Sequence, residues 1–510
     1  MTLYVNNVEI QTATVVDNIA TFIATDFNPG DVIRVEGATT NDTFTFTDYS
    51  EEYVFTTNGN WNVAANWSPA VPTAARNVTV NAACTIPTPY TAKTNNITIG
   101  ENGSLTIADG GQLYHNNEGV MATVQKTITA YTTDRDGWHL IGYSSAENGA
   151  IAEMGNLLEN NNDLYYYDEP THYWRNHKNT NNNFTELEAA RGYLYANSAN
   201  ITIGLKGILE ASNAMVSLPL NYTDGIPLAG FNLVGNPFAH NVTAYTGTSI
   251  ASECYRMNST RTDLMVDNIS DTNPLMPGEG FFVKATGNNA SITFNSRAKG
   301  ENARQGHIVL EISENDRIVD RLIVKNEGEP LEKFTLRKNG TKVFAMHDNQ
   351  EMAVVPIEGN EQAIYFEAAK NGTYTISLST ENTTLPYLHL IDNKTGNDVD
   401  LLQTPSYSFE AKTTDYASRF KLVFVCGDAN DDNDPSTSSG TFAFINNGNI
   451  IITADVEGAT LQVIDVMGRV IVSREGDISG NVSTSGMAPG TYVLRLIKDD
   501  NVMTQEIVIR

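Results

Sequence analysis

The sequence predicts an all-β protein built from several modules. Short runs of alternating apolar and polar residues recur along its 510 residues, as in 373–378 and 461–465, and clusters of Gly, Asn, Asp and Pro separate them. One weak helical candidate, 151–159, interrupts this pattern. Because one hydrophobic core rarely serves a chain of this length, we expect a series of β-sandwiches, Ig-like or jelly-roll, with a short parallel β-solenoid among them.

The charge balance indicates what the protein does not bind. Asp and Glu number 60 against 32 Lys and Arg, which gives a formal net charge of −28. This excess disfavours nucleic acid as a partner and favours a hydrated surface. The sequence contains no run of 18 apolar residues, so it predicts no transmembrane helix. The first residues lack the basic and apolar regions of a signal peptide, so if the protein is exported, its true N-terminus lies upstream of Met1.

The first two modules differ in their pattern. Residues 1–52 predict a small or truncated Ig-like β module, with one strand expected at Thr12–Val16 and another at Ala20–Ala24. Residues 53–128 carry short apolar triplets, such as Val78–Val80 and Ile97–Ile99, between tight turns, which is typical of the rungs of a β-solenoid. An antiparallel meander is the alternative. Trp61 and Trp67 are expected to cap the open end.

Residues 129–296 predict a duplicated β-sandwich, because three segments recur in order. The three pairs are Gly137–Gly142 with Gly230–Gly235, Leu164–Asp168 with Cys254–Met257, and Ala190–Tyr195 with Gly278–Val283. One such match can arise by chance, whereas three in the same order indicate two similar units. We expect the glycines at the strand entries to allow sharp bends.

The rest of the chain divides at a tether. Residues 297–425 predict another β-sandwich. Residues 426–440 form an acidic and serine-rich linker without apolar periodicity. Residues 441–510 then predict a compact module of seven strands, with hairpin glycine Gly468 and a Pro489–Gly490 turn.

This last module resembles a known family. The segments 461–470, 486–496 and 505–510 are similar, in order and spacing, to the type A sorting domain of the Bacteroidetes type IX secretion system. The resemblance implies an Ig-like fold that an outer-membrane translocon recognises. It also implies removal of the tag near residues 426–440 by a sortase-like peptidase, which leaves the protein secreted or attached to the outer membrane at the cell surface. The residues that it implies for recognition are Gly468, Pro489, Gly490, Tyr492 and Arg510.

Sequence motifs for catalysis are missing from the chain. The eight histidines form no tight metal-ligand spacing, and we find no nucleophile elbow or phosphate-binding loop. Cys84, Cys254 and Cys426 lie too far apart to indicate a disulfide framework, and we expect the first two to be small buried apolar residues. We therefore expect no catalytic residues, no metal ligands and no cofactor. Calcium is the alternative at the acidic run 428–434, which offers oxygen ligands at alternate positions but lacks the closing glutamate and central glycine of a complete calcium loop.

An aromatic stretch over 165–175 is the best candidate for ligand binding. Tyr165, Tyr167, Tyr173 and Trp174 are rings that suit stacking on a glycan or a host-surface protein. The alternative is core packing of alternate members.

Three functions remain open at this point. The first is a non-catalytic cell-surface or secreted protein, an adhesin or scaffold, exported through its sorting domain. The second is the C-terminal accessory region of an exported peptidase or glycan-degrading enzyme whose catalytic domain lies upstream or is absent. A third, that the chain itself hydrolyses glycans, requires two carboxylates facing each other in a cleft.

Overall fold

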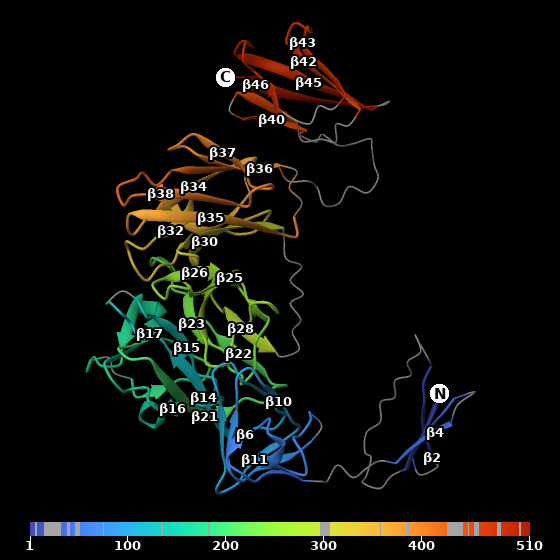
Figure 1. The fold of residues 1–510 in the computed structure, drawn as a ribbon, viewed down its shortest axis with the longest axis vertical. Coiled ribbons are helices and arrows are strands. Elements are labelled where there is room, and N and C mark those ends of the chain that lie inside the picture. Colours follow the sequence, from blue (N-terminus) through green and yellow to red (C-terminus); the bar gives the residue numbers. More distant parts are fainter. Residues whose placement is uncertain are drawn as a thin grey trace. The chain divides into compact units, whose positions relative to one another are not determined.

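The structure, a computed structural model, is all-β as predicted (Figure 1). It describes residues 1–5, 8–14, 32–37, 41–45, 52–74, 76–133, 136–181, 184–295, 306–357, 359–383, 385, 387–425, 442–446, 448–452, 458–476, 481–498 and 501–509. The chain divides into two compact units, Met1–Ala303 with Phe334–Lys338, and Arg304–Lys333 with Asn339–Arg510.

The first four strands form one antiparallel sheet in the order β2-β1-β3-β4. They are β1 (Thr2–Val5), β2 (Val8–Thr12), β3 (Val32–Glu36) and β4 (Asn41–Thr45). The strand predicted at Thr12–Val16 is wrong for its described residues, because the strand β2 ends at Thr12 and pairs with β1 as a tight hairpin, with Val5 opposite Val8; Val15 and Val16 lie outside the described residues. The strand predicted at Ala20–Ala24 lies outside the described residues.

The next segment coils into the predicted parallel β-solenoid. Strands β8 and β11, β9 and β12, and β10 and β13 pair in parallel, so the antiparallel meander is wrong here. The elements of this segment are β5 (Tyr53–Phe55), β6 (Gly59–Asn60), η1 (Ala64–Asn66), β7 (Trp67–Ser68), β8 (Val78–Val80), β9 (Ala83–Ile86), β10 (Thr91–Lys93), β11 (Ile97–Ile99), β12 (Ser104–Ile107), β13 (Gln112–Tyr114) and β14 (Val120–Ile128).

Successive turns of the solenoid stack both apolar and polar side chains. The apolar triplets share one buried core. At one corner, Asn95 Nδ2 donates to Asn77 Oδ1 at 2.8 Å, and Asn116 Nδ2 donates to Asn95 Oδ1 at 3.0 Å. A side-chain amide that both donates and accepts can continue from turn to turn in this way.

Both ends of the solenoid are covered by antiparallel strands. β14 pairs with β21 (Ile201–Leu209) along its whole length, and β7 pairs with β5. Trp67 lies on β7, and its ring meets Trp61 edge to face at 4.7 Å. The two tryptophans thus belong to the core at the end where the first rung lies, as expected.

Two sheets with the same strand order follow the solenoid. Repeat sheet 1 has the order β15-β20-β17-β18, and repeat sheet 2 has the order β23-β27-β25-β26. The three pairs of matching segments fall on equivalent strands, β15 with β23, β17 with β25 and β20 with β27, which supports a duplication. These strands are β15 (His139–Gly142), β17 (Asn162–Asp168), β18 (Tyr173–Asn176), β20 (Gly192–Asn197), β23 (Phe231–Gly235), β25 (Ile250–Met257), β26 (Leu264–Asp267) and β27 (Gly280–Ala285).

Smaller elements accompany the repeat sheets, among them a two-stranded sheet β16-β19 and a three-stranded sheet β22-β28-β24. These are β16 (Gly149–Ala150), η2 (Ile151–Glu153), η3 (Glu169–Thr171), β19 (Glu186–Leu187), β22 (Met215–Pro219), β24 (Tyr245–Thr248) and β28 (Ser291–Asn295). The helix predicted over 151–159 is wrong, because only the single 3-10 turn η2 forms. Gly155 ends it by exchanging backbone hydrogen bonds with Gly204.

The repeat sheets meet at four glycines. Gly142 pairs with Gly192 in repeat sheet 1, and Gly235 pairs with Gly280 in repeat sheet 2. A Cβ added at Gly142 would lie 2.8 Å from the Cα of Gly235 and 2.3 Å from the carbonyl oxygen of Glu279. The sequence therefore needs glycine here for close backbone approach.

Two backbone hydrogen bonds at this junction are related by the same local two-fold arrangement as the repeats. The Gly142 N–H donates to the Gly278 carbonyl at 2.9 Å, and the equivalent Gly235 N–H donates to the Ala190 carbonyl at 2.8 Å. Each bond joins one repeat to the other. The two donors, Gly142 and Gly235, are equivalent positions in the sequence match, and so are the two acceptors, Gly278 and Ala190. This reciprocity is typical of two similar units packed around a local symmetry axis.

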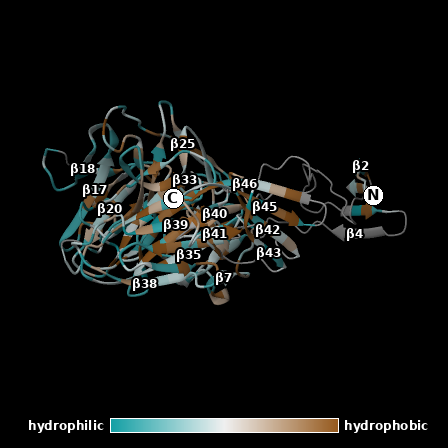
Figure 2. Cartoon of the chain, turned by 90° about the horizontal axis from the view of Figure 1, so that it is seen from above, coloured by the Kyte–Doolittle hydropathy of each residue, from teal (hydrophilic) through white to brown (hydrophobic). Residues whose placement is uncertain are grey.

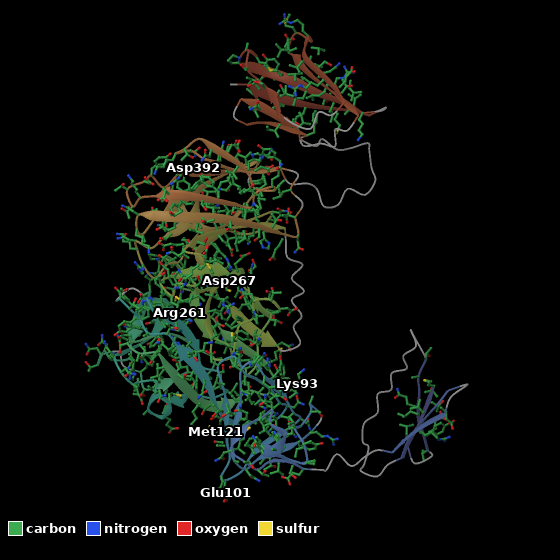
Figure 3. All side chains as sticks on the ribbon, viewed as in Figure 1. Lys93, Glu101, Met121, Arg261, Asp267 and Asp392 are labelled. Carbon is green, nitrogen blue, oxygen red and sulfur yellow. The ribbon has the colours of Figure 1, made fainter. Side chains whose placement is uncertain are left out.

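Two buried polar groups also join the repeat sheets. Glu169, 2% exposed, accepts hydrogen bonds from the Thr223 N–H and hydroxyl and from the Gly230 N–H. Arg261, labelled in Figure 3, donates from Nη1 to His139 Nδ1 at 2.7 Å. Burial and the Arg261 charge lower the pKa of His139 to about 3, so its ring is neutral and can accept this bond.

Replacing Gly142 with alanine should lower the free energy of unfolding by about 3 kcal/mol, because rigid backbone surrounds the new methyl group. Urea denaturation followed by tryptophan fluorescence measures this, since Trp138 and Trp174 lie in or beside repeat sheet 1. Gly287→Ala is the control. Its added Cβ has nothing within 4 Å among the described atoms, so a change under about 0.5 kcal/mol is expected. Equal effects of both substitutions would contradict the close junction.

The second unit contains an 11-stranded sheet in the order β37-β36-β39-β34-β32-β33-β30-β29-β35-β38, with β31 paired to β33. Among these strands, only β30 and β33 pair in parallel. Ig-like or jelly-roll connectivity stays a prediction. The strands are β29 (His307–Glu314), β30 (Arg317–Lys325), β31 (Leu331–Glu332), β32 (Lys342–His347), β33 (Gln350–Pro356), β34 (Glu361–Glu367), β35 (Gly372–Glu381), β36 (Tyr387–Asp392), β37 (Asn397–Asp400), β38 (Ser406–Ala411) and β39 (Phe420–Val425).

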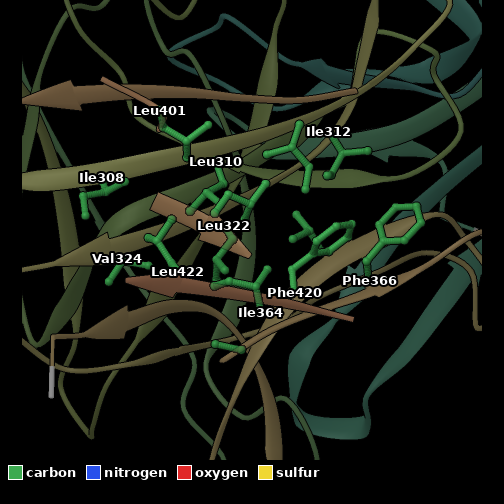
Figure 4. Close-up of a cluster of buried hydrophobic side chains, with 14 of the residues drawn as sticks. Ile308, Leu310, Ile312, Leu322, Val324, Ile364, Phe366, Leu401, Phe420 and Leu422 are labelled. Atoms are coloured by element: carbon green, nitrogen blue, oxygen red, sulfur yellow. The ribbon is translucent and has the colours of Figure 1, made fainter. Parts of the chain in front are cut away.

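This sheet curls around a single apolar core. Ile308 and Leu310 from β29, Leu322 from β30 and Phe420 and Leu422 from β39 point into it together (Figure 4). Alternate residues of each strand supply these side chains, which is the alternation that the sequence showed.

Candidate functional site

The last seven strands form a small module of two sheets. One sheet has the order β40-β41-β44 and the other β43-β42-β45-β46. The strands are β40 (Ala443–Asn446), β41 (Asn449–Ile452), β42 (Ala459–Asp465), β43 (Val470–Gly476), β44 (Asn481–Ser483), β45 (Gly490–Lys498) and β46 (Asn501–Ile509). All seven predicted strands are present.

The module has a hydrophobic core made of its own side chains. Buried residues between Phe442 and Ile509 form one cluster, which includes Leu461 and Leu494. Gln505 on β46 also ties the ends together. Its Oε1 accepts from the Phe442 and Ala443 N–H groups at 2.7 and 2.8 Å, and its amide donates back to the Ala443 carbonyl. The first and last strands of the module are therefore fastened to each other.

A tight hairpin joins β42 and β43, as predicted. Gly468 adopts φ +77°, where a side chain would be strained. Asp465 holds the turn, since its Oδ1 accepts from the Met467 and Arg469 N–H groups at 3.0 and 2.9 Å. Hydrogen bonds from the Arg469 backbone and side chain lower the pKa of Asp465. The hairpin tip thus has a defined shape.

Three of the predicted recognition residues gather at one end of the larger sheet. Asp465, at the base of the Gly468 hairpin, pairs with Tyr492, two residues beyond the start of β45 at Gly490. Gly490 pairs in turn with Ile509 at the end of β46. Pro489 and Gly490 are exposed there. Arg510 lies outside the described residues.

Tyr492 differs from Gly468, Pro489 and Gly490, because it lies mostly inside the module. Its side chain is 7% exposed and belongs to the core, while its hydroxyl donates to the Ala488 carbonyl at 2.8 Å. It therefore shapes the exposed turn at Pro489 from within.

The outer face of the larger sheet carries exposed apolar side chains that sequence reasoning missed. Val470, Ile464 and Val493 pair across three strands, with a register shift beside Ile464, and Val470 and Val493 are 49% and 37% exposed. At the adjoining hairpin tip, Val466 and Met467 are each 77% exposed. The signal was present where apolar residues stand next to each other, as at Val463–Ile464 in β42 and Tyr492–Leu494 in β45, and Figure 2 shows brown, apolar segments in this module. Exposed apolar patches of this kind mark interaction surfaces. We call these five residues the outer apolar face.

The aromatic stretch over 165–175 is a hairpin of repeat sheet 1 rather than a loop. Its register places Tyr167 opposite Trp174 and Asp168 opposite Tyr173. Because side chains alternate, Tyr165, Tyr167 and Trp174 share one face and Tyr173 lies on the other.

The two faces of this hairpin have different surroundings. Tyr167 is 5% exposed, packs edge to face against Phe282 at 5.5 Å, and its hydroxyl bonds His172 Nδ1 at 2.9 Å. Burial raises its pKa. Trp174 also packs on Phe282, whereas Tyr173 is 67% exposed. Of the four residues singled out in the sequence, Tyr173 thus presents the most accessible ring.

Groups that could carry metal or thiol chemistry are sparse in the described ranges. Cys84 and Cys254 are free and buried in strands, as expected, and burial raises the pKa of the Cys84 thiol to about 12. No cluster of three His, Cys, Asp or Glu side chains suited to a metal occurs among the described residues. Cys426 and the acidic run 428–434 lie outside them.

Comparison with known proteins identifies the last module. Residues 446–510 match the family model described as "Secretion system C-terminal sorting domain". No curated protein matches the chain. Among solved structures, "Biofilm associated protein - BSP domain" aligns over 78% of this chain and 97% of that chain, with 9% identity and a TM-score of 0.13. A TM-score this low supports no argument about fold or function.

The family match agrees with the resemblance seen in the sequence. Residues 446–510 have the features of a type IX sorting domain, which implies interaction with that secretion machinery, and the chain is secreted or displayed at the cell surface. No helix in the described parts of the chain has both the length and the apolar character that crossing a bilayer requires.

Proposed function

We propose that the protein is a non-catalytic adhesin or scaffold of the cell surface, exported through its C-terminal module. The observation that carries this proposal is the module over 442–509, which has its own core and matches a sorting-domain family. The modules before it supply rigid β structure with a strongly acidic composition, which suits a hydrated surface protein. The boundaries at 52, 128, 296, 425 and 440 are part of the same proposal.

Recognition by the translocon would use the end of the sheet where Gly468, Pro489 and Gly490 gather, together with the outer apolar face. Fixed turns present a defined backbone shape, and apolar side chains supply the area that drives association. Tag removal by a sortase-like peptidase would follow near residues 426–440. For the exported part, Tyr173 is the ring that we propose for contact with a glycan or host protein.

The experiment is to fuse residues 426–510 to a reporter in a host with a type IX system. The reporter should reach the medium or the cell surface, whereas the same fusion without residues 501–510 should stay in the periplasm, because β46 completes the sheet. Retention of the full fusion in the periplasm would overturn the export role.

Paired variants separate recognition from folding. Changing Val466 and Met467 to serine should reduce export at least tenfold, since it removes the most exposed apolar side chains while leaving the core intact. Changing Ser473 and Thr504 to alanine alters the same outer face at polar positions, and export should stay within twofold of the parent. Far-ultraviolet circular dichroism of each purified module checks the fold. Equal export of the two folded variants would contradict a role for the outer apolar face.

A further inference from the structure

A lysine and an aspartate are sealed together inside the 11-stranded sheet. Lys333, the residue after β31, places its Nζ 2.6 Å from both carboxylate oxygens of Asp320 on β30. Their side chains are only 1% and 2% exposed. Burying two charges in this way costs more than an ordinary structural role needs, since apolar residues of similar volume serve a core at least as well.

The groups around this pair are neutral backbone groups. The Val343 N–H donates to Asp320 Oδ2 at 2.7 Å, and Lys333 Nζ donates to the Arg321 carbonyl at 3.1 Å. Burial raises the pKa of Asp320, although the lysine and the backbone donors oppose this. In such surroundings one proton moving from the ammonium to the carboxylate leaves a neutral amine beside a neutral acid, which avoids two buried charges.

We propose that Lys333 Nζ and the Asp320 carboxyl carbon join in an intramolecular amide bond. After the proton moves, the neutral amine attacks Cγ, and a C–N bond forms as the C=O π bond opens. The Val343 N–H stabilises the negative oxygen of the tetrahedral intermediate, while the Arg321 carbonyl orients the amine. The C–OH bond then breaks, its oxygen leaves with a proton from the nitrogen as water, and no oxidant or other reactant is needed.

The surroundings of Lys333 and Asp320 favour amide formation there over amide formation between Lys342 and Glu351. Nucleophile and carboxyl are already in contact, so little orientation is lost on reaching the transition state. Lys342 Nζ also lies 2.6 Å from both oxygens of Glu351, but that carboxylate is 40% exposed. Solvent that reaches Glu351 stabilises the ion pair, and an ammonium is not a nucleophile.

The bond would close a covalent loop between β30 and the end of β31. Lys333 and Asp320 are 13 residues apart, and a link of that span restricts the unfolded chain as a disulfide does. Unlike a disulfide, an amide resists reduction, and the two described cysteines are free and buried. Such a link suits a β module that works outside the cell.

The test is mass spectrometry of the purified full chain. The intact mass should be lower than the sequence mass by one water. Trypsin should not cleave after Lys333, so peptide 318–321 should appear joined to peptide 326–337. Lys342 and Glu351 should appear unlinked in the same digest, which makes them an internal control. An intact mass equal to the sequence mass would overturn the proposal. A loss of water located elsewhere, at Asp109–Gly110 or between Lys342 and Glu351, would also overturn it.

Two variants sharpen this result. Lys333→Met should restore the full sequence mass and lower the midpoint temperature of unfolding of this unit. Asp320→Asn should give the same linked product as the parent, because the amide carbon then loses ammonia instead of water. Detection of the joined peptides in Lys333→Met would show an artefact and overturn the assignment. If a variant does not fold, the parent mass alone decides.

Discussion

Replacing Arg419 with leucine should lower the free energy of unfolding of the 11-stranded sheet by about 3–5 kcal/mol, because it leaves Asp392 as a buried charge without its partner. The Arg419 guanidinium, 2% exposed, donates to both oxygens of Asp392 at 2.9 and 2.7 Å. It also lies over the rings of Phe409 and Phe420 at 4.6 and 5.0 Å. Hydrogen-exchange mass spectrometry of peptides from 387–425 measures the local loss.

The pH dependence of this effect separates the ion pair from simple packing. Burial alone would raise the pKa of Asp392, but hydrogen bonds from Arg419 and its neighbours hold it below its usual value. The pair therefore stabilises the fold above an unfolded pKa of about 3.9, and this stability is lost as pH falls through the lower folded pKa. The difference between parent and variant should thus be larger at about pH 7 than at about pH 3.

A control two residues further along the chain tests whether burial is the cause. Lys421 pairs with Glu361 at 3.1 Å, but the two side chains are 31% and 48% exposed. Lys421→Ala should therefore cost less than about 1 kcal/mol. If Lys421→Ala cost as much as Arg419→Leu, the buried pair would not be the main source of stability.

The architecture could be predicted from the sequence wherever the local pattern of apolar residues matches the packing that the fold requires. The triplets at Val78 and Ile97 predicted parallel rungs, since each needs a neighbour to bury its apolar face. The Gly142 and Gly235 matches likewise predicted two equivalent sheets. The error at Thr12–Val16 arose because a hairpin register depends on pairing across the turn, which single-strand alternation does not contain.

Contacts between distant residues could not be predicted in the same way. Nothing near Glu169 or Lys333 distinguishes either from the other charged residues of an acidic chain, because their partners are fixed only by the folded register. The number of aromatic residues available for ligand binding in 165–175 was overestimated for a related reason. Alternation shows that Tyr167 and Tyr173 face opposite ways, but only the packing of Phe282 shows which face is buried.

Replacing Trp61 with alanine should lower the free energy of unfolding of the solenoid by about 3–5 kcal/mol. Trp61 is fully buried, packs against Trp67, and accepts the Trp67 Nε1–H at its carbonyl at 2.6 Å. The backbone N–H of Trp61 donates to the Thr85 carbonyl in the next turn. Loss of the indole would leave a cavity at the end where the first rung lies, and each later rung depends on the one before it. Urea denaturation followed by fluorescence of the remaining tryptophans measures the change.

Trp61→Phe distinguishes the apolar volume from the polar group of this side chain. Trp61 Nε1 is buried and finds no hydrogen-bond partner among the described residues. A buried unpaired donor costs about 1–3 kcal/mol, so phenylalanine should lose volume but regain part of that cost. We expect Trp61→Phe to be at least 2 kcal/mol more stable than Trp61→Ala. Equal stability of the two variants would mean that the ring does not fill the solenoid end, and the terminal rung would then have to be held by backbone pairing alone.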